Sequence, residues 1–85
     1  MEQKTSLVEA VVTSVIGGGE RAYAVTRLKA PFSESGLPVN TTVTFSISAY
    51  QDDHAPSKGQ MVYLMGIEKF AKGWRARSAQ PIRAK

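Results

Sequence analysis

The sequence predicts a small all-β domain built as a five-stranded barrel. Three observations support this: stretches rich in β-branched residues recur at short intervals, turns bearing glycine or proline separate them, and one stretch alternates strictly between apolar and polar side chains. The chain has 85 residues, the size of one domain, so residues 1–85 are expected to form a single unit. Short strands at this spacing suit a small barrel.

The first two strands are expected over residues 6–16 and 21–28. The first carries four valines and an isoleucine, and this many β-branched residues disfavours a helix, which is the main alternative for the stretch. The triplet Gly17-Gly18-Gly19 follows and marks a turn. A phosphate-binding loop is a weaker interpretation of these glycines, because the Gly-Lys-Ser/Thr that completes such a loop is missing.

Residues 41–48 form the clearest strand of the chain. Val43, Phe45 and Ile47 alternate there with threonines and serines, so one face is expected in the core and the other toward solvent. The flanking polar segments, residues 30–40 and 49–59, are expected to be loops because both carry proline and glycine.

Each of these two loops contributes one aromatic side chain, Phe32 and Tyr50, which we expect to cap the core, the alternative being a lid over a ligand. One helical turn is expected near Tyr50.

The fourth and fifth strands are expected over residues 60–70 and 74–82, joined by a hairpin turn at residues 71–73. Residues 61–67 are apolar on both faces, which is typical of a strand that is central in a barrel or covered by another chain. Pro81 lies near the end of the fifth strand, where its missing backbone donor costs little.

Positive charge is concentrated near the end of the chain. The net charge is +4, and residues 69–85 contain six basic residues and no acidic one: Lys69, Lys72, Arg75, Arg77, Arg83 and Lys85. A one-sided basic segment attracts polyanions such as nucleic acid. The alternative is a solvated edge strand whose lysines and arginines discourage pairing with other chains.

Composition argues against several classes of function. The chain has no cysteine, which excludes disulfides and thiolate chemistry, and it has no apolar run near the ~18 residues that would span a membrane. The first residues do not resemble a secretory signal, so a cytoplasmic location without membrane contact is expected. The lone His54 follows Asp52 and Asp53, but three consecutive loop residues rarely converge on one ion. With no nucleophile or partnered base in a known motif, we expect a non-enzymatic protein without metal or cofactor.

Three short motifs in the second half occur in a familiar order. They are Val-Thr-Phe-Ser-Ile-Ser-Ala-Tyr at residues 43–50, Pro-Ser-Lys-Gly-Gln-Met-Val at 56–62 and Lys-Gly-Trp-Arg-Ala at 72–76. They resemble the third strand and its turn, the loop into the fourth strand, and the final hairpin of cold-shock-type OB domains. The resemblance covers residues 43–82 and implies a small five-stranded OB-like barrel that binds single-stranded DNA or RNA.

The first half departs from that family. Residues 21–25, Arg-Ala-Tyr-Ala-Val, are the nearest counterpart of its Lys-Gly-Phe-Gly-Phe motif and keep one basic and one aromatic residue. Thr44 and Ser46 stand where the family carries the Phe and His that stack on bases. The overall layout is also loosely similar to the small single-stranded-DNA-binding proteins of filamentous phages, which are short, β-rich and basic near the end.

Two clusters of rings and cations are the candidate nucleic-acid-binding residues. On the second expected strand, Arg21, Tyr23 and Arg27 project to one side at a period of two, so Tyr23 can stack on a base between two phosphate-binding arginines. Near the fifth strand, Trp74 lies among three further candidates, Lys72, Arg75 and Arg77. The structural alternative places Tyr23 at the rim of the core and Trp74 inside it.

Two functions from different classes follow. The first is a module that binds single-stranded nucleic acid, DNA or RNA, through a basic and modestly aromatic β-face. The second is a protein-interaction or adaptor domain in which residues 61–67 contact a second copy or another protein. The basic segment favours the first function, and the missing stacking rings favour the second. The fold does not decide between them, because OB barrels serve both purposes.

Overall fold

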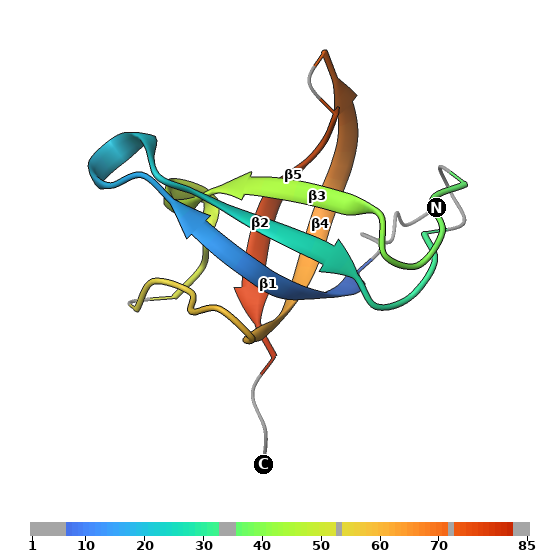
Figure 1. Ribbon diagram of the computed structural model, residues 1–85, viewed down its shortest axis with the longest axis horizontal. Coiled ribbons are helices and arrows are strands. Elements are labelled where there is room, and N and C mark those ends of the chain that lie inside the picture. The colour runs from blue at the N-terminus through green and yellow to red at the C-terminus, as the bar shows by residue number, and fades with distance from the viewer. Residues whose placement is uncertain (1–6, 33–35, 53, 72, 83–85) are drawn as a thin grey trace, which may run out of the picture.

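The computed structural model describes residues 7–32, 36–52, 54–71 and 73–82, and the chain folds into a closed five-stranded barrel (Figure 1). The strands are β1 (Val8–Ile16), β2 (Tyr23–Leu28), β3 (Thr42–Ser46), β4 (Met61–Phe70) and β5 (Gly73–Pro81). Two 3-10 turns also lie in these ranges, η1 (Gly19–Arg21) and η2 (Ile47–Ala49). The predicted all-β class and small OB-like barrel are confirmed.

The strands pair in the order β1-β2-β3-β5-β4, and β4 returns to β1 to close the barrel. Every pair is antiparallel except β3 and β5, which run parallel where Val43 lies opposite Trp74 and Thr44 opposite Arg75. Because the start of β5 lies beside β3, the β4–β5 hairpin extends past the β3 side of the barrel (Figure 1).

Most predicted strand ends shift by one or two residues, and two of these shifts place residues in a 3-10 turn instead of a strand. Arg21 is predicted on the second strand, but it ends η1, because the chain makes a tight turn that begins at Gly19, the last glycine of the triplet, and β2 begins only at Tyr23. Ile47 was expected on the third strand, but it begins η2. This turn brings Tyr50 beside Ala79 of β5, and the Ile47 side chain still packs against the core from outside the strand.

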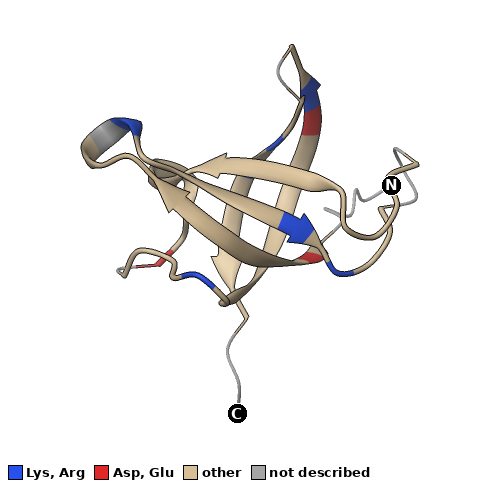
Figure 2. Cartoon of the chain, in the orientation of Figure 1, with Lys and Arg blue, Asp and Glu red and all other residues tan. Residues whose placement is uncertain are grey.

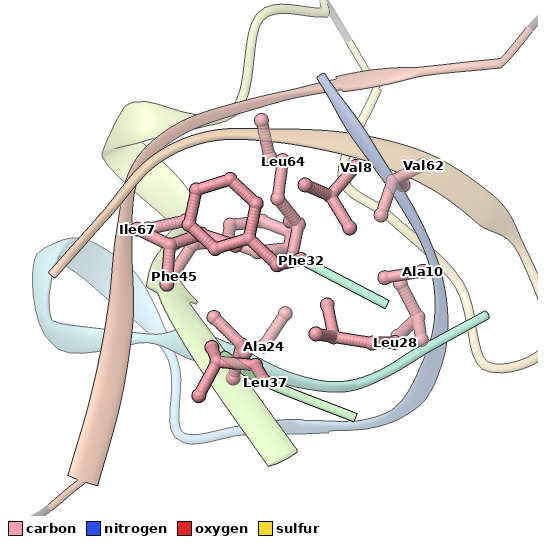
Figure 3. Packing of buried hydrophobic residues seen from close by; sticks show 14 of the residues in the cluster. Val8, Ala10, Ala24, Leu28, Phe32, Leu37, Phe45, Val62, Leu64 and Ile67 are labelled. Atoms are coloured by element: carbon pink, nitrogen blue, oxygen red, sulfur yellow. The ribbon is translucent and has the colours of Figure 1, made fainter. Parts of the chain in front are cut away.

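The barrel interior is filled by side chains from all five strands and from two loops (Figure 3). Phe45 is the largest side chain with no exposed surface, and its ring stacks on Tyr50 with centroids 5.6 Å apart. The Tyr50 hydroxyl accepts a hydrogen bond of 2.8 Å from the Gln60 side chain. Phe32 is buried in the same core, and its backbone forms a bridge with Leu37 in the β2–β3 loop. Phe32 and Tyr50 therefore cap the core as predicted.

β4, which contains the apolar residues 61–67, is paired along both of its edges, with β1 on one side and β5 on the other. Val62, Leu64 and Ile67 point into the core. Met61, Tyr63 and Met65 are half-buried on the outside of the barrel. β4 is therefore a central strand with an apolar outer row.

Gly66 bends β4 and changes which of its side chains face the core. Leu64 is buried two residues before it, whereas Ile67 is buried one residue after it, so the in–out alternation shifts at the glycine. The glycine has a φ of +66°, a left-handed conformation that suits a bend at a barrel corner. Beyond this bend, Glu68 and Phe70 lie exposed near the tip of the hairpin.

Gly66→Ala is expected to lower the free energy of unfolding by about 2 kcal/mol. A side chain in the left-handed region is strained, and a Cβ at this position would lie 3.0 Å from the Cβ, Cγ and Cδ atoms of Arg77. Urea denaturation measures the loss. Gly18→Ala is the matched control, because Gly18 has an extended φ of −145° and open space around it. Equal unfolding midpoints for the two variants would contradict the role assigned to Gly66.

Candidate functional site

The outer faces of β2 and β3 form a continuous surface with one ring, one cation and a row of hydroxyls. Side chains at every second position of β2 point outward, as the period-two pattern predicted. Their cross-strand partners are the polar residues of β3, in the pairs Tyr23–Ser46, Val25–Thr44 and Arg27–Thr42. Tyr23 is half-buried and Arg27 is exposed, so the ring and the charge lie at opposite ends of the surface.

A groove of about 720 Å³, here called the main groove, lies between this surface and the β4–β5 hairpin. One side is lined by Tyr23, Thr42 and Thr44, and the other by hairpin residues Phe70, Ala71, Gly73, Trp74 and Arg75. Binding sites for small organic ligands have volumes of roughly 300–1,000 Å³. The main groove therefore has room for one or a few stacked planar groups.

The two rings of the hairpin differ in how far a ligand can reach them. The Arg75 guanidinium carbon lies 5.6 Å from the centre of the Phe70 ring, and Phe70 is 46% exposed as a residue. Trp74 packs against the core, and the Lys69 ammonium lies 5.7 Å from its ring centre. Phe70 therefore offers the more accessible face, and Trp74 serves the groove mainly as a wall.

The predicted site residues are only partly brought together. Tyr23, Trp74 and Arg75 line the main groove. Arg27 lies just outside it, opposite the lining residue Thr42. Arg21 is exposed at the end of η1, two residues before Tyr23, and is not among the residues that line the main groove. Lys72 lies outside the described residues.

Arg77 lies in a second depression, here called the side groove, of about 330 Å³. The residues that line it are Ser46, Ala49, Glu68, Phe70, Arg75, Ala76 and Arg77. The guanidinium of Arg77 is 3.6 Å from the Glu68 carboxylate, and both side chains are largely exposed. Such a surface ion pair contributes little stability, so both groups can exchange partners easily.

Phe70 is a site residue that the sequence prediction missed. The sequence predicts a two-sided apolar stretch that ends at Ile67, and it predicts Phe70 only as the last residue of the fourth strand. Its signal was its place directly before a hairpin turn, four residues from Trp74. A large apolar side chain at a hairpin tip has few core partners and remains exposed to a ligand.

Basic residues lie on β2 and on the β4–β5 hairpin, which line the main groove together with β3. Figure 2 shows Lys and Arg segments at the tip of the β1–β2 hairpin, on β2 and on the outer part of the β4–β5 hairpin. From the predicted basic segment, the described residues are Lys69, Arg75 and Arg77, and all three belong to the β4–β5 hairpin. β5 pairs with both β3 and β4. The edge-strand interpretation of this charge therefore does not apply to β5.

No protein-family model matches the chain, and neither a curated protein nor a solved structure matches it. The resemblance of residues 43–82 to cold-shock-type domains thus stays a prediction. Within the described ranges, no helix is long and apolar enough to cross a membrane. In the same ranges, no three His, Asp or Glu side chains gather as metal ligands would.

Proposed function

We propose that this barrel binds single-stranded nucleic acid in the main groove and catalyses no reaction. The observation that carries the proposal is the meeting of Tyr23, Phe70 and Arg75 along one groove on the outer face of β2 and β3. Rings that accept a base and cations that accept a phosphate are the two requirements for binding single strands without sequence preference. The same face of OB barrels commonly binds oligonucleotides.

The arrangement favours a single strand over a duplex. Tyr23 and Phe70 can stack only on bases whose faces are open, and a duplex keeps its bases stacked inside. Arg75 lines the groove and Arg27 lies opposite its lining residue Thr42, so these two cations are placed to hold phosphates, and Arg21 lies two residues before Tyr23. We expect binding to depend strongly on salt, with a slope of roughly −0.7 per phosphate contacted.

Fluorescence anisotropy tests the proposal directly. A labelled single strand of about 16 nucleotides is titrated with protein at about 50 and about 200 mM salt, with DNA and RNA versions and an unlabelled duplex as competitor. Salt-sensitive binding with weak competition by the duplex is the expected result. Absence of binding at the lower salt would overturn the proposal, because even non-specific electrostatic attraction is measurable there.

Tyr23→Ala is expected to weaken binding at least about fivefold, because stacking contributes about 1–3 kcal/mol per base. The salt slope should stay the same, since no charge is removed. Tyr23→Phe keeps the ring and should bind like the original chain. Arg21→Ala should instead flatten the slope by about 0.7. Unchanged affinity of Tyr23→Ala would show that β2 provides no stacking platform.

A protein-interaction role remains the second candidate, and the outer row of β4 favours it. Met61, Tyr63 and Met65 are half-buried and adjacent on one outer face. Sedimentation equilibrium over a range of protein concentrations tests whether a second copy covers them. A molecular mass that rises with concentration, and no longer rises in Met65→Lys, would support this role. A constant monomer mass would rule out self-association.

A further inference from the structure

The side groove continues the proposed nucleic-acid-binding surface. It shares Phe70 and Arg75 with the main groove, so these two residues form a ridge between the depressions. Ser46 lines the side groove and is the cross-strand partner of Tyr23 in the main groove. A single-stranded nucleic acid with one base stacked on Tyr23 can therefore place the neighbouring base across the ridge.

Glu68 makes the side groove chemically different from the main groove. It is the one acidic residue among the described side chains that line either groove. The distance of 3.6 Å from its carboxylate to the Arg77 guanidinium exceeds that of a good charge-assisted hydrogen bond. The carboxylate oxygens are therefore available as acceptors, and they repel phosphate. A group that donates hydrogen bonds is the ligand that they favour.

Among the nucleobases, guanine offers the donors that fit a carboxylate best. Its Watson–Crick edge carries an N1–H beside the N2 amino group, so two adjacent donors face the two oxygens of a carboxylate. Adenine and cytosine carry an amino group beside a ring nitrogen that is an acceptor. Thymine and uracil carry one N–H between two carbonyl oxygens, which a carboxylate repels. An ionised carboxylate only accepts hydrogen bonds, so it discriminates among these edges.

We propose that the side groove is a base-recognition subsite that selects guanine, with the Glu68 carboxylate accepting from N1–H and the N2 amino group. The Phe70 ring and the Arg75 guanidinium supply the surface on which the base stacks, and Arg77 is released from Glu68 to meet a phosphate. The Ser46 hydroxyl, 2.9 Å from the Ser48 hydroxyl, is a further polar group on the wall. This subsite rests on the proposed function, since it reads a strand already held in the main groove.

The test compares single strands of equal length at one salt concentration. A strand of alternating thymine and guanine is expected to bind at least about fivefold tighter than a strand of thymine alone. Replacing guanine by hypoxanthine, which lacks the N2 amino group, should remove part of this preference. Glu68→Gln should bring the guanine and thymine strands to equal affinity. Glu9→Gln is the matched control, because Glu9 is exposed on β1 and lines neither groove.

Each result separates the subsite from the function on which it rests. Equal binding of both strands by the original chain would overturn the guanine subsite and leave single-strand binding intact. A preference that persists in Glu68→Gln would also overturn it, because another group would then read the base. Arg77→Ala provides a second check: it keeps Glu68, so the guanine preference should survive while the salt slope flattens. No binding of any strand would overturn the proposed function and the subsite together.

Discussion

Phe45→Ala is expected to lower the free energy of unfolding by about 3–5 kcal/mol. The Phe45 side chain has no exposed surface and is the largest of the fully buried residues. It lies on β3 and stacks on Tyr50, so it connects a barrel strand to the segment that caps the core. Removing the ring leaves a cavity between these elements. Small domains have a total stability of about 5–15 kcal/mol, so this loss is a large fraction of the whole.

Urea denaturation followed by circular dichroism measures this effect. Phe70→Ala is the matched control, because it makes the same chemical change at an exposed ring on the hairpin tip. We expect Phe70→Ala to cost less than about 1 kcal/mol, since little apolar surface there is removed from water. If the two variants lost equal stability, the division between a structural Phe45 and an available Phe70 would be wrong.

The core was predictable from the sequence where the alternation of apolar and polar residues along one strand determines which side chains are buried. In β3, the alternation of Val43 and Phe45 with polar residues placed both side chains in the interior, because successive side chains of a strand point to opposite faces. The same rule placed Tyr23 and Arg27 on one outer face of β2. These predictions needed no knowledge of the partner strand.

The rest of the fold depends on pairing across the barrel, and no local pattern reports it. Gly66 shifts the alternation of β4, so the period before it does not continue to Phe70. Its left-handed conformation follows from the bend that closes the barrel. Likewise, the sequence predicts the second strand from Arg21, but β2 begins two residues later, at Tyr23, because the 3-10 turn η1 takes up Gly19 to Arg21.

Which residues meet at the site depends on one long-range contact, the parallel pairing of β3 with β5. This pairing places the hairpin beside Thr44, a position where the resembled family carries a stacking ring. In the present chain the hairpin brings the Phe70 ring to the same groove. The groove therefore has an accessible ring although the threonine and serine of β3 supply none. The departure from the family motif is compatible with the proposed function.

Loss of both Phe70 and Arg75 is expected to be the most damaging change to nucleic-acid binding. These two residues line both grooves, and the guanidinium lies 5.6 Å from the centre of the ring. Phe70→Ala should weaken binding about tenfold by removing a stacking surface, with no change in the salt slope. Arg75→Ala should weaken it by a similar factor and flatten the slope by about 0.7, because a phosphate contact is lost.

The double variant tests whether the ring and the guanidinium act as one unit. If Arg75 holds the Phe70 ring in place for the base, the second substitution removes a contact that the first has already weakened. The fold-loss of affinity in the double variant is then smaller than the product of the two single fold-losses. Lys58→Ala is the control, because Lys58 is exposed and lines neither groove, so its removal should leave affinity nearly unchanged. Losses that multiply fully would mean that ring and cation act independently. If neither single variant weakened binding, the hairpin would not belong to the interface. Binding would then depend on the face of β2 and β3 alone.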